Sequence, residues 1–99
     1  KARAEANYSI GALLEKKGRP AEAIKVYVSV YSNFPGHLDW STKAFNNSAE
    51  ILSARGQKGD ALKVLVDMLK RMGHLDHEKV TEAREQFKKW KAEWVAENQ

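Results

Sequence analysis

Apolar residues recur along this chain at intervals of three and four positions, the spacing that places side chains on one face of an α-helix. Glycine and proline interrupt the pattern at Gly18, Pro20, Pro35 and Gly73, and a glycine-containing turn spans residues 56–59. Glycine commonly ends a helix, and proline fits its first turn. The uninterrupted segments therefore predict helices over residues 2–17, 20–34, 39–55, 60–72 and 76–96.

The apolar stripe of each segment predicts which face is buried against the other helices. The expected inward-facing residues are Ala6, Ile10, Leu13, Leu14 and Lys17 in the first helix, Ala23, Ile24, Tyr27, Val30, Tyr31 and Phe34 in the second, Ala44, Phe45, Ser48, Ala49 and Leu52 in the third, Ala61, Leu62, Leu65, Met68, Leu69 and Met72 in the fourth, and Val80, Ala83, Phe87, Trp90 and Trp94 in the fifth. Short polar side chains favour helix N-caps. We therefore expect Asp39 or Ser41, Asp60 and Asp76 to cap the last three helices.

One segment also fits a β-strand. The alternating β-branched residues are Ile24, Val26, Val28 and Val30. A strand over residues 25–31 is consistent with that alternation. However, Ala23, Tyr27 and Phe34 fit only the helical period, and the segments on either side are helical. We therefore predict a helix here as well, and an all-α protein.

The first helix pair can be aligned on the second pair with a shift of 38 residues. The matched positions are Gly11 with Ala49, Leu14 with Leu52, Gly18 with Gly56, Ala23 with Ala61, and Tyr27 with Leu65. A fixed period of this size is typical of helical repeats that stack into a solenoid. The small residues at Gly11 and Ala49 allow the second helix of each pair to approach closely, and Tyr27 and Leu65 fill the space one turn further along.

The order of these residues resembles the tetratricopeptide repeat, in which small and large positions alternate across a helix hairpin. The residues that carry the resemblance are Ile10, Gly11, Leu14, Ala23, Tyr27 and Pro35 in the first pair, and Phe45, Ala49, Leu52, Ala61 and Leu65 in the second. The first pair is most similar to repeats of bacterial periplasmic and outer-membrane members. The resemblance implies one right-handed solenoid domain over residues 1–99. Its parts are a first repeat at about 4–37, a second at about 39–73, and a long capping helix at about 76–97.

In tetratricopeptide proteins the first helix of each pair lines a groove that binds a peptide or a helix of another protein. The resemblance places the following residues in such a groove: Tyr8, Ser9, Ala12, Glu15, Lys43, Asn46, Asn47 and Glu50. Asn46 and Asn47 are the most informative, because an amide both donates to and accepts from a peptide backbone. Asparagine is also a poor choice within a helix, and simple solvent exposure is the other interpretation. We expect a non-catalytic scaffold module whose partner is a protein or peptide.

Charge and composition narrow the remaining functions. The formal net charge is +4, from 17 Lys and Arg against 13 Asp and Glu, which is too mixed to indicate nucleic acid binding. The chain has no cysteine, which excludes disulfides and thiolate metal sites within it. No apolar run approaches the roughly 18 residues of a membrane helix. The sequence does not distinguish a cytoplasmic from a periplasmic location.

Candidate chemistry is sparse. His74 and His77 lie near Asp76 and Glu78, but the only other histidine is the distant His37, so we expect a polar turn and no metal site. No G-x-S-x-G motif or Gly-rich phosphate loop is present, and we expect neither catalytic residues nor a cofactor.

The fifth helix supports a second hypothesis. Trp90 and Trp94 follow Lys88 and Lys89 on a helix that we expect to be longer than two helix pairs can cover. The tryptophans fit the buried stripe, but they also suit self-association, and the lysines are expected on a solvated face. A homo-oligomer assembled through this helix is therefore the alternative to a peptide-binding scaffold. Binding of nucleic acid or a membrane surface is the least favoured interpretation.

Overall fold

The computed structural model describes residues 2–99, which form five α-helices without a strand. The helices are α1 (Ala2–Lys16), α2 (Pro20–Asn33), α3 (Leu38–Ala54), α4 (Lys58–Met72) and α5 (Glu78–Glu97). The all-α prediction is confirmed. The strand alternative is wrong, because residues 25–31 lie inside α2.

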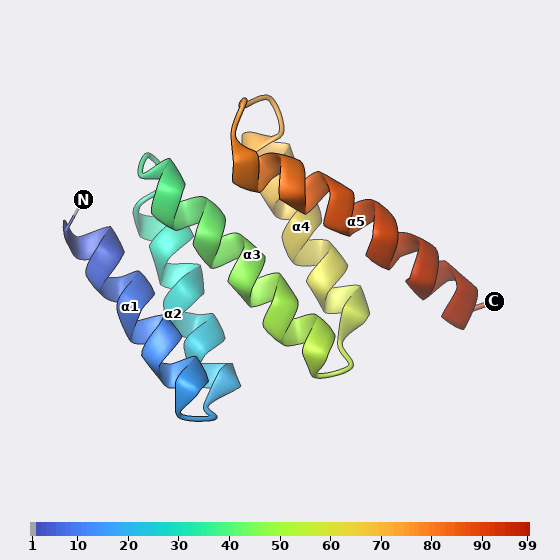
Figure 1. The fold of residues 1–99 in the computed structure, drawn as a ribbon, viewed down its shortest axis with the longest axis horizontal. Coiled ribbons are helices and arrows are strands. Elements are labelled where there is room, and N and C mark those ends of the chain that lie inside the picture. Colours follow the sequence, from blue (N-terminus) through green and yellow to red (C-terminus); the bar gives the residue numbers. More distant parts are fainter. Residues whose placement is uncertain (1) are drawn as a thin grey trace.

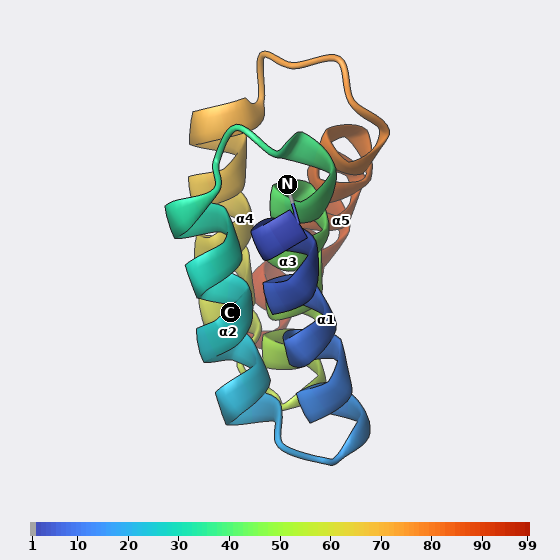
Figure 2. The ribbon, with the colours of Figure 1, turned by 90° about the vertical axis from the view of Figure 1, so that its left-hand side faces the viewer.

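Each helix runs antiparallel to the one before it and packs on it (Figure 1). The helices form two layers, with α1, α3 and α5 in one layer and α2 and α4 in the other (Figure 2). Within the first layer, α3 also contacts both α1 and α5. The result is a slab of 44 × 33 × 17 Å in which α3 occupies the centre of one face.

The core lies between the two layers. Its largest fully buried side chains include Tyr27, Phe45, Leu65 and Met68. The Tyr31 and Phe45 rings stack with their centroids 3.6 Å apart, joining α2 to α3. On α1, a Cβ added at Gly11 would lie only 2.6 Å from Cε1 of Tyr27. The predicted close approach of α1 and α2 at Gly11 is therefore confirmed.

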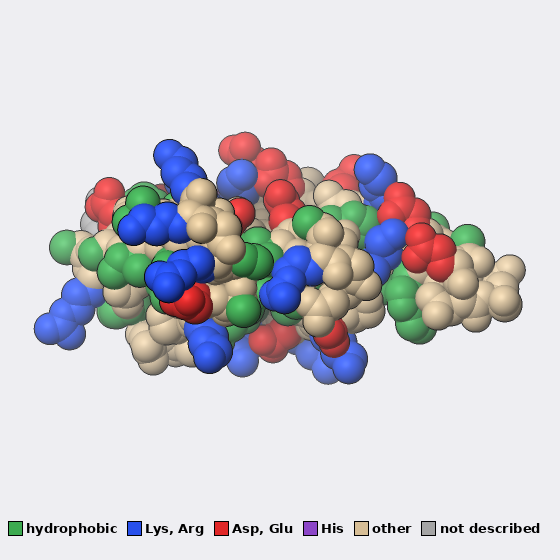
Figure 3. Space-filling model, turned by 90° about the horizontal axis from the view of Figure 1, so that it is seen from below, with side chains coloured by type: hydrophobic (Ala, Val, Ile, Leu, Met, Phe, Trp, Pro, Cys, Tyr) green, Lys and Arg blue, Asp and Glu red, His purple; other side chains and the backbone are tan. Residues whose placement is uncertain are grey.

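The predicted inner face of α1 is wrong for most of its residues, although Leu14 packs against the core as expected. Ile10 and Leu13 are 48% and 52% exposed, and Ala6 is exposed as well. The buried residues of α1 are Ala4 and Gly11. Small residues are buried because α1 approaches α2 closely at Gly11, and this rotates the apolar stripe outward at the end of the helix row. Figure 3 accordingly shows hydrophobic side chains at the surface of that end and also at the α5 end.

The predicted helix caps are also wrong. The N-caps of α3, α4 and α5 are His37, Gln57 and His77. Asp39, Asp60 and Asp76 were expected there. Asp39 lies inside the first turn of α3, and its Oδ1 is 3.1 Å from Nε2 of His77. Ser41 is buried and donates its hydroxyl to the Phe34 carbonyl at 2.8 Å. Nδ1 of His77 accepts a hydrogen bond from the Lys79 N–H at 3.0 Å. The His77 imidazole therefore caps the N-terminus of α5, the role predicted for the Asp76 carboxylate.

Candidate functional site

A groove of about 700 Å³ runs over α3 between α1 and α5. Its lining comes mainly from polar side chains of α3 and α5, with single contributions from α1 and α4. The residues that line it are Tyr8, Lys43, Asn46, Asn47, Ala49, Glu50, Leu65, Lys79, Thr81, Glu82, Glu85, Gln86, Lys89 and Trp90. The groove therefore has a polar surface, with apolar side chains contributed by three of the helices.

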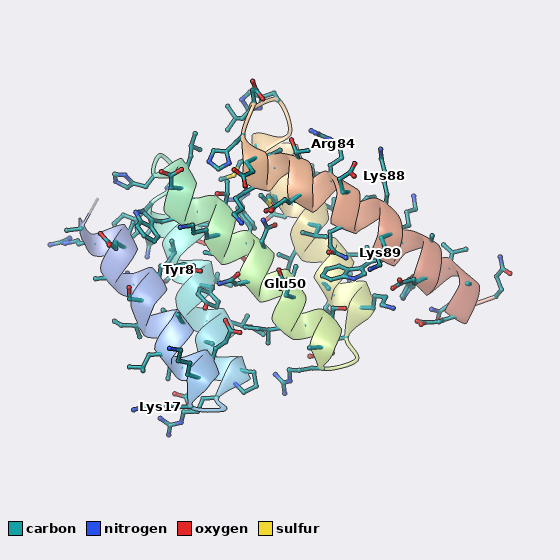
Figure 4. All side chains as sticks on the ribbon, viewed as in Figure 1. Tyr8, Lys17, Glu50, Arg84, Lys88 and Lys89 are labelled. Atoms are coloured by element: carbon teal, nitrogen blue, oxygen red, sulfur yellow. The ribbon has the colours of Figure 1, made fainter. Side chains whose placement is uncertain are left out.

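The structure brings together five of the eight side chains that the resemblance placed in a groove: Tyr8, Lys43, Asn46, Asn47 and Glu50. Ser9, Ala12 and Glu15 do not line the groove. Successive residues of a helix are turned by about 100°, so a helix that directs Tyr8 at α3 directs Ser9 elsewhere. Glu15 is exposed and accepts a hydrogen bond from the Tyr27 hydroxyl at 2.7 Å. Figure 4 shows Tyr8 reaching from α1 toward α3.

Asn47 joins α3 to both α1 and α2. Its Nδ2 donates to the hydroxyl of Tyr8 at 2.8 Å and to that of Tyr27 at 3.3 Å. The Tyr8 ring lies between those of Tyr27 and Trp40, with centroid distances of 5.5 and 5.4 Å. These contacts tie the floor of the groove to the core, so Asn47 has a structural role that does not require a ligand.

Asn46 makes a similar link on the other side of α3. Its Nδ2 donates to the Lys79 carbonyl at 3.3 Å, which fastens the first turn of α5 to α3. We expected the two amides to offer both donors and acceptors to a peptide. Each amide donates within the fold, and among the described residues neither side-chain oxygen accepts a hydrogen bond. A ligand would therefore meet both amides as acceptors, and Asn46 also keeps a second amide hydrogen to donate.

The buried hydroxyl of Tyr27 leads to a prediction about alkaline pH. Burial of the Tyr27 hydroxyl, and to a smaller extent its hydrogen bond to Glu15, raises the pKa of Tyr27 above its ordinary value. Burial also raises the pKa of Tyr31. Above pH about 10 the unfolded chain loses tyrosine protons that the folded chain keeps, so stability falls as pH rises further. In the double variant Tyr27→Phe/Tyr31→Phe, we expect the free energy of unfolding to fall less steeply between neutral and alkaline pH. Urea unfolding at a series of pH values measures it.

In that variant the free energy of unfolding should still fall at alkaline pH, but by a smaller amount. Hydrogen bonds to Glu93 and Glu82 raise the pKa values of Lys58 and Lys79, respectively, which acts in the same direction. An unchanged slope in the double variant would show that the two tyrosines ionise alike in the folded and unfolded states.

The charges of the groove are partly paired within it. Lys79 forms an ion pair with Glu82 at 3.0 Å. Nζ of Lys43 lies 4.6 Å from the ring centroid of Trp40, a cation–π contact. Glu50 and Lys89 are exposed on α3 and α5, on the face toward the viewer in Figure 4. The groove thus offers charges of both signs to a ligand.

Sequence analysis missed the contribution of α5, because it treated that helix as a cap. Four of the missed residues are Glu82, Glu85, Gln86 and Lys89. They follow Lys43, Asn46, Asn47 and Glu50 by 39 positions each, close to the shift that relates the first two helix pairs. A shift of 39 finds all four, whereas the shift of 38 leads to Thr81, Arg84, Glu85 and Lys88, of which only Thr81 and Glu85 line the groove.

The two tryptophans suggested for self-association differ in exposure. Trp90 is only 9% exposed and belongs to the core, whereas Trp94 is 40% exposed. Trp94 is therefore the more accessible of the two, and Trp90 also lines the groove.

Within residues 2–99, the histidine and acidic side chains form no group of three or more that is placed to hold a metal ion. The same residues contain no helix that combines the length and apolarity needed to cross a membrane. No protein-family model, curated protein or solved structure matches the chain.

Proposed function

We propose that this chain is a tetratricopeptide-like solenoid module that binds a peptide or helix of a partner protein in the groove over α3. The observation that carries the proposal is the convergence of Tyr8, α3 and α5 on one hollow that presents polar side chains above an apolar floor. Such a mixture of apolar surface with a few placed polar groups is typical of ligand sites.

The arrangement of the helices supports the solenoid part of the proposal. The first helix of each predicted pair lies in one layer and the second helix lies in the other, and α5 continues the first layer (Figures 1 and 2). A solenoid stacks helix pairs so that each contacts only its neighbours. The packing of α2 on α3 and of α4 on α5 fits that scheme.

The chemistry of the groove suits the binding of a peptide. Its lining includes no histidine, serine or cysteine, and its ionisable side chains are glutamates, lysines and a tyrosine. Instead it offers amide oxygens, which accept hydrogen bonds from backbone N–H groups, and exposed charges of both signs. A peptide supplies the complementary donors and charges along its length.

A charge-exchange experiment tests this function. Peptides selected on the wild-type chain from a random library should bind the groove variant Lys43→Glu/Glu50→Lys about tenfold more weakly, which corresponds to about 1.4 kcal/mol. The two substitutions exchange the charges and leave the net charge unchanged. Fluorescence anisotropy of the labelled peptide measures the affinity.

The matched control is Glu22→Lys/Lys25→Glu, which makes the same exchange at exposed positions of α2. It should bind like the wild type, and both variants should melt like the wild type. A library that yields no binder, or binders that both double variants hold equally well, would refute the groove as the binding site.

A further inference from the structure

A second, shallow and open depression lies along a flank of α5 that is distinct from the groove. Its apolar lining consists of Phe87, Ala92, Val95 and Ala96, and Val95 is 40% exposed. No residue of α1 to α4 takes part in this lining. Phe87 packs partly against the core, and Nζ of Lys91 lies 5.7 Å from its ring centroid. Ala92, Val95 and Ala96 are exposed and form the open apolar part of the flank.

The charges on this flank have one sign. Lys88 and Lys91 are the only ionisable side chains that line the depression, and both are exposed. Figure 4 shows Lys88 and Arg84 pointing away from α3, on the opposite edge of α5 from Lys89. An occupant of this depression must therefore tolerate or neutralise a basic surface.

The packed side of α5 shows how this helix recognises a neighbour. There Glu93 and Glu97 meet Lys58 of α4, with Nζ to carboxylate distances of 3.0 and 3.5 Å. Oppositely charged side chains thus flank the existing apolar contact between α4 and α5. By the same electrostatic rule, a helix on the lysine-bearing flank should carry carboxylates beside its apolar stripe.

In a second copy of this chain, the exposed apolar face of α1 does not fit that requirement. It contains Ile10 and Leu13. That face is bordered by Arg3, seven residues before Ile10, and by Lys16, three residues after Leu13. Residues at these spacings share a helix face, so docking α1 on the flank would bring like charges together.

The shape of the flank disfavours a membrane surface. A helix that lies in a bilayer interface projects bulky apolar side chains outward. Here Ala92 and Ala96 leave a depression beside Phe87 and Val95. A depression of this kind accepts the side-chain ridge of another helix.

We propose that this flank of α5 docks an amphipathic helix of another protein whose apolar stripe is bordered by Asp or Glu. The site is separate from the groove over α3, so that a protein bound in the groove and one bound at α5 make different contacts. Lys88 and Lys91 provide the charge selectivity, and Phe87 and Val95 provide the apolar contact.

Two synthetic helical peptides of about 18 residues, five turns, test the proposal. Both carry the same Leu and Ala face, bordered by Glu in one peptide and by Lys in the other. The wild-type chain should bind the Glu-bordered peptide, and the Lys-bordered peptide about tenfold or more weakly. The variant Lys88→Glu/Lys91→Glu should reverse this preference, as measured by titration calorimetry.

The matched control is Lys63→Glu/Lys70→Glu, which changes the net charge equally at exposed positions of α4. It should keep the wild-type preference. Equal binding of both peptides, no binding of either, or a preference unaffected by the Lys88 and Lys91 substitutions would overturn the proposal. So would binding to phosphatidylserine vesicles, or self-association by sedimentation, that depends on these two lysines while the Glu-bordered peptide does not bind.

Discussion

We expect the substitution Leu65→Ala to lower the free energy of unfolding by about 2–5 kcal/mol. Leu65 is 1% exposed and lies on α4 within the core. Truncating it removes buried apolar surface and leaves a cavity that rigid neighbours cannot fill. Domains of this size have a total stability of roughly 5–15 kcal/mol. Urea unfolding followed by circular dichroism should therefore show a large fall in the midpoint, or loss of the folded state at room temperature.

Leu13→Ala is the matched control, since it makes the same chemical change at a side chain that is 52% exposed. Its effect should stay within about 0.5 kcal/mol. Comparison of the two variants also distinguishes the orientation of α1 in the structure from the one that its apolar stripe predicts. If Leu13→Ala were as costly as Leu65→Ala, the face predicted from the apolar stripe would be buried and the orientation in the structure would be refuted.

The first helix shows where hydrophobic periodicity misleads. Its apolar stripe runs through Ile10 and Leu13, yet Ala4 and Gly11 are the buried residues. Periodicity weighs side chains by their hydrophobicity, whereas the contact with α2 depends on how close the two backbones can come. The glycine that permits this approach contributes nothing to an apolar stripe. The main partner of α1 is α2, the next helix in the chain, but the stripe of one helix does not show how closely the two helices pack.

The inner faces of α2 and α4 could be predicted because each of these helices has neighbours on both sides. Tyr27 and Val30 on α2, and Leu65 and Met68 on α4, are all buried as expected. The stripe of α5 holds as far as Trp90 and fails at Trp94. Figure 1 shows the C-terminal end of α5 extending beyond α4, which leaves Trp94 partly exposed.

The candidate groove shows a different limit of sequence reasoning. The resemblance to the tetratricopeptide repeat placed the α3 side chains Lys43, Asn46, Asn47 and Glu50 in a groove, and all four line it. It did not reveal that Asn47 donates to the hydroxyls of Tyr8 and Tyr27. That network joins three helices, so it depends on their packing and has no local signature. Replacing Asn47 would consequently disturb the fold together with the groove, and charge exchange at Lys43 and Glu50 is the cleaner test.

Gly11→Ala should destabilise the fold by about 1–3 kcal/mol, although helix propensity alone predicts the opposite. Alanine within a helix is favoured over glycine by about 0.8–1.0 kcal/mol. At Gly11, however, the added Cβ would lie 2.6 and 2.8 Å from two carbons of the Tyr27 ring. The ring is fully buried, and its hydroxyl is bonded to Glu15 and Asn47. It therefore cannot turn away without losing those bonds, and α1 must shift from α2.

Gly59→Ala is the control that separates the effect of the steric clash from that of helix propensity. Its added Cβ would meet only Nε1 of Trp94, at 3.5 Å, an ordinary contact distance. We expect that variant to be unchanged or slightly more stable in thermal melts. In a Tyr27→Leu background, which removes the ring, Gly11→Ala should become neutral or stabilising. A double-mutant cycle with no coupling between the two positions would contradict the close approach of α1 and α2. Coupling would establish that the smallest side chain of α1 determines which face of this helix is buried, and so why its apolar stripe lies outside.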